Sequence, residues 1–343
     1  MKEERFQILS LSGGGIRGLY TISVLATIEH ILSKKNNDDN YNIARHFDLI
    51  SGTSIGGILA LGLASGINAR ELQKIIDKHR LEIFPQNNIK NIPFLGSFLN
   101  YLKLAFCSLY QSEPLKKVLM DTFGDKIIKD LNVKVVIPSV NATTGLPKVY
   151  KTPHCTQFVT DQQLSLVDVG MATSAAPTYF NPHLLNNCVM VDGGLIANSP
   201  SFIAYHEATN FLDVQKENIY LLSIGTMGVQ ETLNSDRFLS SKWGYLTGWG
   251  MGSKLVNLTL STNESLHNFV TKHLLKERFV ELDDHNTPNQ SNSITLDNAN
   301  DKAAQMLKGR GYDKGQSALG DQNVMAFFYN YPKTETNFYK GTM

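Results

Sequence analysis

The sequence predicts an α/β layer fold with a mainly parallel sheet. Short apolar runs typical of strands alternate with longer runs of helical character along the first two thirds of the 343-residue chain. Three of these strands are followed by residues able to carry chemistry, namely Gly13, Ser54 and Asp192. Ligand sites in such sheets lie beyond the carboxyl ends of the strands, so we expect one crevice to hold all three.

The first unit of the chain is a strand, a loop and a helix. We expect a strand over Phe6 to Leu11, a glycine-rich loop over Gly13 to Gly18 and a helix over Leu19 to Leu32. A polar surface loop follows over Lys34 to Asn40. Backbone N–H groups of successive glycines ahead of a helix can cradle negative charge, so this loop is a candidate anion-binding element.

The second unit carries a serine at its turn. A strand over Phe47 to Ile50 and a buried helix over Gly57 to Ser65 enclose a Gly-x-Ser-x-Gly sequence, Gly52 to Gly56. So tight a turn forces its central residue into a strained backbone, and the flanking glycines remove Cβ clashes. Ser54 is therefore the candidate nucleophile, and Gly52 and Gly56 form the expected nucleophile elbow.

The rest of the chain contains weaker element signals. Thr173 to Pro182 ends a helix, and beyond Thr226 the sequence becomes aromatic, glycine-rich and polar. We expect a catalytic core over 6–226, with 227–343 as a cap or regulatory extension packed on the same domain. The remaining strands are expected over Leu131 to Val140, Val189 to Val191, Ile219 to Ile224 and Val324 to Tyr331, and a last helical piece over Asn298 to Leu307.

Composition excludes several classes of protein. Lys and Arg number 32 against 31 Asp and Glu, so no electrostatic argument favours a nucleic acid polymer as partner. Cys107, Cys155 and Cys188 are widely spaced without a Cys-x-x-Cys motif, which favours a reducing compartment and no metal site. The first residues pass from charge directly into a strand, so we expect a cytoplasmic protein.

One apolar segment, Ile92 to Tyr110, has nearly the length of a membrane span. Pro93, Gly96, Asn100 and Lys103 interrupt it, whereas a transmembrane helix is more uniformly apolar. We interpret it as a buried core helix or as a lid that lies on lipid.

Acyl transfer needs a nucleophile, a base and donors for the oxyanion. The loop Ser12 to Gly18 lacks the Walker Lys-Ser/Thr and the dinucleotide glycine spacing, which disfavours nucleotide phosphates as its ligand. Its glycines are the candidate oxyanion donors, and Arg17 either adds positive charge or braces the loop.

The base is less clearly indicated. Asp192 stands at a strand end before two glycines, where a carboxylate in a dry site takes a proton from Ser54. The alternative is a histidine in a Ser–Asp–His order, and both remain open at this point. The histidines that follow Asp192 in the sequence are His206, His267, His273 and His285.

Taken together, the motifs resemble those of the patatin-like phospholipase family. Gly-Gly-Gly-Ile-Arg-Gly, Gly-Thr-Ser-Ile-Gly and Asp-Gly-Gly occur in its order and spacing, and "ATSAAPTYFNP" and "ANSP" resemble its pattern too.

The resemblance implies a three-layer fold with a mainly parallel central sheet and helices on both faces. It implies phospholipase A-type hydrolysis of membrane phospholipid esters, without cofactor or calcium. The residues it implies are a Ser54–Asp192 dyad and an oxyanion hole from Gly13, Gly14 and Gly15 with Arg17 beside it. The residue before the glycines is often acidic in the family and is Ser12 here.

Short bacterial patatin-like proteins with such a C-terminal region resemble effectors of anti-phage signalling. This resemblance makes a cyclic nucleotide activator, peripheral contact with the inner face of the membrane, and a homo-oligomer our further hypotheses. Residues past Thr226 with the chemistry to hold bases or phosphates are Trp243, Trp249, Lys254, Arg278 and Arg310. Two alternatives stay open: an α/β-hydrolase-type esterase with a histidine triad, and a catalytically silent membrane-associated adaptor.

Overall fold

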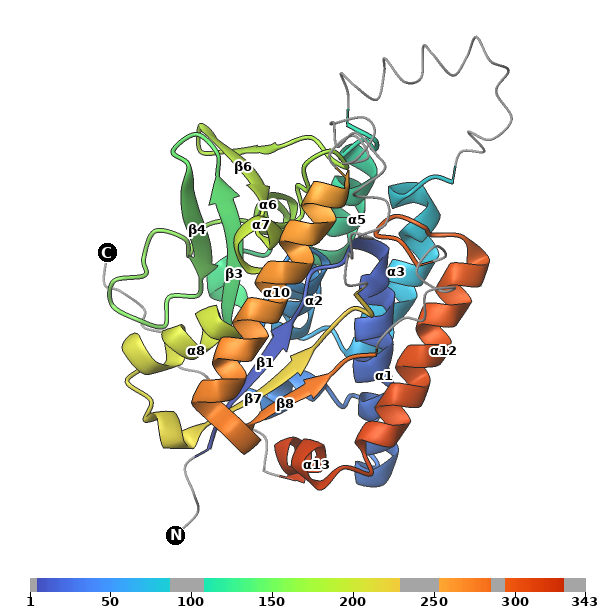
Figure 1. Ribbon diagram of the computed structural model, residues 1–343, viewed down its shortest axis with the longest axis vertical. Coiled ribbons are helices and arrows are strands. Elements are labelled where there is room, and N and C mark those ends of the chain that lie inside the picture. Colours follow the sequence, from blue (N-terminus) through green and yellow to red (C-terminus); the bar gives the residue numbers. More distant parts are fainter. Residues whose placement is uncertain (1–4, 87–107, 229–252, 285–293, 330–343) are drawn as a thin grey trace, which may run out of the picture.

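The computed structural model describes residues 5–86, 108–228, 253–284 and 294–329. Its centre is an eight-stranded sheet with the order β5-β6-β3-β2-β1-β7-β8, and β4 also pairs with β3 (Figure 1). The strands are β1 (Phe6–Leu11), β2 (Leu49–Gly52), β3 (Lys134–Asn141), β4 (Leu146–Lys151), β5 (His183–Leu185), β6 (Cys188–Asp192), β7 (Ile219–Ile224) and β8 (Phe279–Leu282).

The sheet is mainly parallel, as the sequence predicts. Strands β3, β2, β1, β7 and β8 run parallel to one another, while β4, β5 and β6 join through antiparallel pairs. β3 extends beyond β2, which it pairs only over its first residues, and β6 runs back along the free part of β3. Asp192 therefore reaches the crevice opposite Ser139 on an antiparallel strand, and not from the carboxyl end of a parallel one.

Helices cover both faces of the sheet, which confirms the three-layer α/β expectation. α1, α2, α3, α5, α6 and α12 lie on one side, and α7, α8 and α10 lie on the other, near side in Figure 1. Alternate strand residues feed the two cores: Leu9 joins one apolar cluster and Ile8 the other. The helices are α1 (Gly18–Asn36), α2 (Ile55–Ala64), α3 (Ala69–Ile83), α5 (Glu113–Phe123), α6 (Leu166–Thr173), α7 (Gly194–Ala197), α8 (Ser201–Asn210), α10 (Ser253–Leu275), α12 (Asp301–Ala318) and α13 (Gln322–Tyr329).

Two expectations for the C-terminal region need correction. Positions 324–329 of the strand expected over Val324 to Tyr331 belong instead to the helix α13, and the last two positions lie outside the described residues. The buried residues of α13 fall at positions 324, 325, 327 and 328, a helical spacing that packs Phe327 and Phe328 against Phe47. The helical piece expected over Asn298 to Leu307 corresponds to α12, which begins at Asp301 and continues to Ala318.

The described residues beyond position 226 pack on the same sheet or on the helices that cover it. β8 pairs with β7 in parallel, and α12 packs on α1. Gly311 and Gly315 permit this close packing, because a Cβ at either position would lie within 2.7 Å of the Cβ atom of Ser23 or Thr27 respectively. The role of this region as a cap or regulatory extension stays a prediction.

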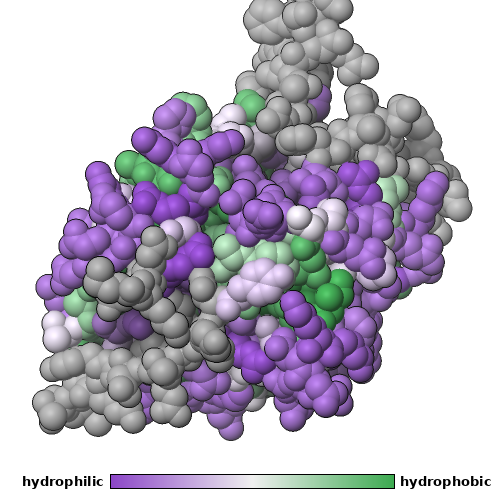
Figure 2. All heavy atoms as spheres, turned by 90° about the horizontal axis from the view of Figure 1, so that it is seen from below, coloured by the Kyte–Doolittle hydropathy of each residue, from purple (hydrophilic) through white to green (hydrophobic). Residues whose placement is uncertain are grey.

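Several expected features lie outside the described residues, including positions 92–107 of the apolar segment, Cys107, Trp243, Trp249 and His285. Among the helices that the structure describes, none is both long and apolar enough to cross a bilayer. In the view from below, the surface is largely hydrophilic, with hydrophobic side chains gathered mainly near the middle (Figure 2).

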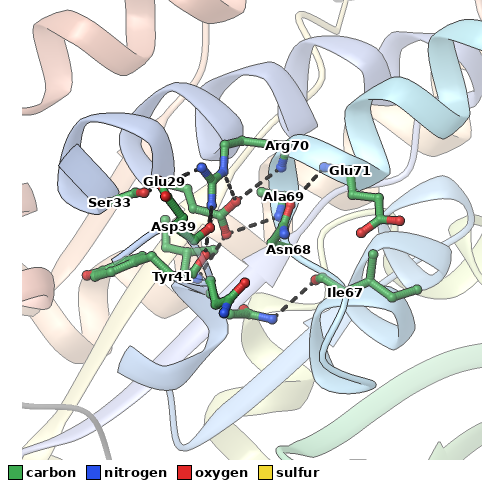
Figure 3. Close-up of polar contacts among 12 residues, drawn as sticks. Glu29, Ser33, Asp39, Tyr41, Ile67, Asn68, Ala69, Arg70 and Glu71 are labelled. Carbon is green, nitrogen blue, oxygen red and sulfur yellow. Dashed lines mark hydrogen bonds and ion pairs between the residues drawn. The ribbon is translucent and has the colours of Figure 1, made fainter. Parts of the chain in front are cut away.

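Helix α3 is anchored by a buried ion pair (Figure 3). Glu29 of α1 is fully buried, and its carboxylate accepts hydrogen bonds from Arg70 Nε at 3.2 Å and from the backbone N–H groups of Ile43, Ala69 and Arg70. A buried carboxylate is tolerated when its oxygens are satisfied in this way. The anchor fixes the start of α3, whose later turns form a wall of the pocket described next.

Candidate active site

Ser54 lies at a strained turn between β2 and α2. Its backbone has φ 55° and ψ −125°, a conformation that non-glycine residues rarely adopt. A Cβ on Gly52 would lie 2.0 Å from the Gly56 carbonyl oxygen, and a Cβ on Gly56 would lie 2.3 Å from that of Leu11. Neither position has room for a side chain, because a backbone carbonyl lies too close. Both residues must therefore be glycine, as we expect for a nucleophile elbow.

Asp192 lies next to Ser54. Its carboxylate accepts a hydrogen bond, 2.6 Å long, from the backbone N–H of Gly194, and the nearby Ser54 hydroxyl favours its charged form. Both side chains are nearly inaccessible, with 9% of Ser54 and 5% of Asp192 exposed. Burial raises the pKa of Asp192 to about 6, although the Gly194 N–H and the Ser54 hydroxyl oppose the shift. Such a carboxylate is a stronger base than an ordinary aspartate.

The glycine loop lies beside this pair, but its three glycines are not equivalent. The Gly13 N–H donates to the Asn198 carbonyl at 2.9 Å, so it is already engaged, and an oxyanion role for Gly13 stays a prediction. Gly14 and Gly15 line the pocket with Ser54, and their N–H groups have no acceptor among the residues that the structure describes. The N–H of Ile55, in the first turn of α2, also lacks an intrahelical acceptor and is a further candidate donor.

Arg17 is buried but does not line the pocket. Burial lowers the pKa of its guanidinium, while the carboxylates of Glu264 and Asp283 raise it. The sequence left two roles open for Arg17, to add positive charge to the site or to brace the loop. Its buried position outside the pocket favours the second role.

An apolar pocket opens beside Ser54 and Asp192. Phe84 and Phe180 in its wall pack against Tyr110, the last residue of the apolar segment that the sequence interprets as a core helix or a lid. An acyl chain is a chemically suitable occupant, because the lining is nearly all aliphatic or aromatic. The apolar lining comes mainly from α2, α3, α5 and the 176–180 segment, with two residues of α10, and its members include Ile58, Leu59, Leu72, Ile76, Leu115, Val118, Leu119, Phe180, Val256 and Leu260.

The histidines lie elsewhere. His206 is exposed on α8, and His267 donates through Nδ1–H to the Ser199 carbonyl at 2.8 Å. His273 bonds within its own helix. Within the described part of the chain, no histidine lines the pocket.

Sequence reasoning missed three polar residues of the site. Thr173 Oγ1 accepts the Ser54 N–H at 3.1 Å, Asn198 bonds the glycine loop, and Glu264 bonds Asn198 at 2.7 Å. The "ANSP" motif contained a signal for Asn198, whereas nothing local to Glu264 marks a residue 66 positions further along.

Comparisons with known proteins find matches over the part of the chain that contains these motifs. A family model described as patatin-like phospholipase matches residues 9–205. A Vibrio cholerae protein named cGAMP-activated phospholipase is 40% identical, and the match covers 96% of both chains. A protein of the same name from Escherichia coli is 40% identical, and the match covers 96% of this chain and 94% of that protein. One from Pseudomonas aeruginosa is 38% identical, with 94% of this chain and 91% of that protein covered.

Proposed function

The chain belongs to the patatin-like phospholipase family, and we propose that it hydrolyses acyl esters of membrane phospholipids through a Ser54–Asp192 dyad, under the control of a cyclic nucleotide. The observation that supports the chemistry is the placement of Ser54 beside the buried carboxylate of Asp192, in the lining of one apolar pocket. A nucleophile paired directly with a buried base is the arrangement that acyl transfer needs.

In the first half of the reaction, Asp192 takes the proton of Ser54 as Oγ attacks the ester carbonyl. The carbonyl oxygen becomes an oxyanion, which accepts hydrogen bonds from the N–H groups of Gly14 and Gly15. One such donor is typically worth about 2.7–4 kcal/mol of the barrier. Collapse of the tetrahedral intermediate breaks the ester bond, and Asp192 returns the proton to the departing alkoxide of the lysolipid.

In the second half, water replaces the lysolipid. Asp192 takes a proton from this water, whose oxygen attacks the acyl group on Ser54. Collapse releases the fatty acid, and the proton returns to Ser54 Oγ. The same carboxylate serves both steps, so the cycle needs no histidine.

The regulatory part of the proposal rests on the relatives. Proteins named cGAMP-activated phospholipase align with more than 90% of this chain, which includes most of residues 227–343. We therefore propose cGAMP as the activator, acting through this extension in anti-phage defence. The sequence suggested Arg278 and Arg310 as residues that could hold bases or phosphates. Both have protein partners in the structure, since Arg278 donates to the Glu217 carbonyl and Arg310 pairs with Asp284.

The cellular setting is part of the same proposal. The enzyme acts from the cytoplasm at the inner face of the membrane, through peripheral contact, and as a homo-oligomer. Flotation with anionic vesicles and light scattering after gel filtration, each with and without cGAMP, test the contact and the assembly.

The decisive experiment is hydrolysis of mixed phospholipid vesicles, with products identified by mass spectrometry. Wild type with cGAMP should release fatty acid and lysolipid, whereas Ser54→Ala and Asp192→Asn should release neither. His206→Ala and His267→Ala should retain activity, and a fluorophosphonate probe should label Ser54. Loss of activity in a folded histidine variant would favour the triad, and absence of turnover and labelling in wild type would favour the silent adaptor.

A further inference from the structure

Helix α10 holds the segment that follows Asp192. Asn263 accepts the backbone N–H of Asn198 at 2.8 Å and donates from Nδ2 to the Gly194 carbonyl at 2.6 Å. One residue further along α10, the Glu264 carboxylate accepts a hydrogen bond from Asn198 Nδ2 at 2.7 Å. These contacts come from a helix beyond residue 205, where the family match ends.

Asn198 connects this helix to the glycine loop. Its carbonyl accepts the Gly13 N–H at 2.9 Å, and its Nδ2 donates to the Gly13 carbonyl at 3.3 Å. Both hydrogens of Nδ2 are thus used, one toward Glu264 and one toward Gly13. Glu264 thus fixes the orientation of the Asn198 side-chain amide, and Asn198 in turn holds Gly13 in position.

Glu264 also faces the loop directly. Burial raises the pKa of its carboxyl, while Ser12, Asn198 and Arg17 favour the charged form. Ser12 and Arg17 lie on either side of the three glycines in the sequence. The carboxylate therefore acts electrostatically on both ends of the loop, and its hydrogen bond goes to Asn198, the residue that pairs with Gly13.

We propose that Glu264 is a positioning residue for the esterase reaction, which holds the glycine loop through Asn198 so that the N–H groups of Gly14 and Gly15 meet the developing oxyanion. This inference rests on the proposed function. Glu264 touches neither substrate nor nucleophile in this role, because it acts only through Asn198 and the ends of the loop.

The role predicts a defect in the transition state more than in substrate binding. Loss of one oxyanion donor costs about 10²- to 10³-fold in kcat, and a misplaced donor costs somewhat less, about 10- to 100-fold. Most of the pocket wall comes from α2, α3 and α5, and the α10 residues that line it, Val256 and Leu260, keep their side chains when Glu264 is replaced, so KM should change by no more than about twofold.

The experiment measures kcat and KM for a short-chain p-nitrophenyl ester with cGAMP present. Glu264→Ala should lower kcat about 10- to 100-fold, whereas Glu264→Gln, whose carbonyl still accepts from Asn198, should recover most of it. The matched control is Glu281→Ala, an exposed acid that bonds α10 through Asn268 at 2.7 Å but not the loop. It should stay within about twofold of wild type.

A double-mutant cycle gives the sharper readout. If Glu264 acts through Asn198, then adding Glu264→Ala to Asn198→Ala should lower kcat little further. Additive losses, or a Glu264→Ala enzyme as active as the control, would overturn the inference. If Glu264→Ala does not fold, Glu264→Asp, which draws the carboxylate back from Asn198, should show the same loss of kcat. An inactive wild type would instead contradict the proposed function.

Discussion

Replacing Asp192 by asparagine is expected to stabilise the protein while abolishing its activity. The Asp192 pKa rises from an ordinary 3.8 to about 6, because burial disfavours its charged form. Between these two values the folded state holds a proton that the unfolded state has released, so folding becomes less favourable as the pH rises. The stabilising contribution is complete below pH 3.8 and is lost as the pH rises past about 6.

The magnitude follows from the two pKa values. A difference between 3.8 and about 6 corresponds to about 3 kcal/mol at 1.36 kcal/mol per pH unit. Asparagine resembles the protonated acid, and its carbonyl can still accept the Gly194 N–H. Asp192→Asn should therefore raise the free energy of unfolding by about 1–3 kcal/mol at pH 8, with no gain left near pH 4.

Urea unfolding of wild type and Asp192→Asn, followed by circular dichroism between pH 4 and 8, measures this difference. Asp121→Asn on α5 is the control, because Asp121 is exposed and its replacement should change stability by less than about 0.5 kcal/mol. The reasoning is refuted if the Asp192→Asn protein is less stable than wild type at pH 8, or if its advantage is the same at every pH.

Three further predictions follow from the site and its supports. The kcat/KM of wild type should fall about tenfold between pH 7 and pH 5, because the base Asp192 must be ionised and has a pKa of about 6; a pH-rate profile that stays flat to pH 5 would contradict it. Glu29→Ala should lower the free energy of unfolding by about 3–5 kcal/mol, since Arg70 loses its buried partner, and urea unfolding at pH 7 would measure that loss. Gly56→Ala should remove activity and lower the melting temperature steeply, because the new Cβ meets the Leu11 carbonyl at 2.3 Å. Gly145→Ala has open space around it, so it should cost only the strain of its positive φ.

The pattern of apolar residues and glycines along the chain was enough to predict the elements whose bounds are set by neighbouring residues. The strand Phe6–Leu11 has its expected bounds because a short apolar run ends at a glycine loop. The prediction failed at α13, where an apolar run of eight residues fits a strand or a buried helix equally well, and contact with Phe47 decides between them. The antiparallel course of β6 was also not predictable, since it depends on the length by which β3 overhangs β2.

The site shows the same limit. Ser54, Gly52 and Gly56 could be placed from sequence because an elbow is made within five residues. The difference between Gly13 and its two neighbours depends on Asn198, which is 185 positions away in the chain. Hydrogen bonds between such distant residues leave no periodicity or spacing to detect in a single sequence.

The pairing of β8 with β7 limits how the chain can be divided. A chain cut after residue 226 would lose β8 and leave the β7 backbone as an unpaired sheet edge, a surface that promotes aggregation. It would also lose Phe279, which is buried with Leu221 in the core on that face. The last third of the protein is therefore expected to be inseparable from the rest, and a truncation intended to release the enzyme from control would yield an insoluble chain.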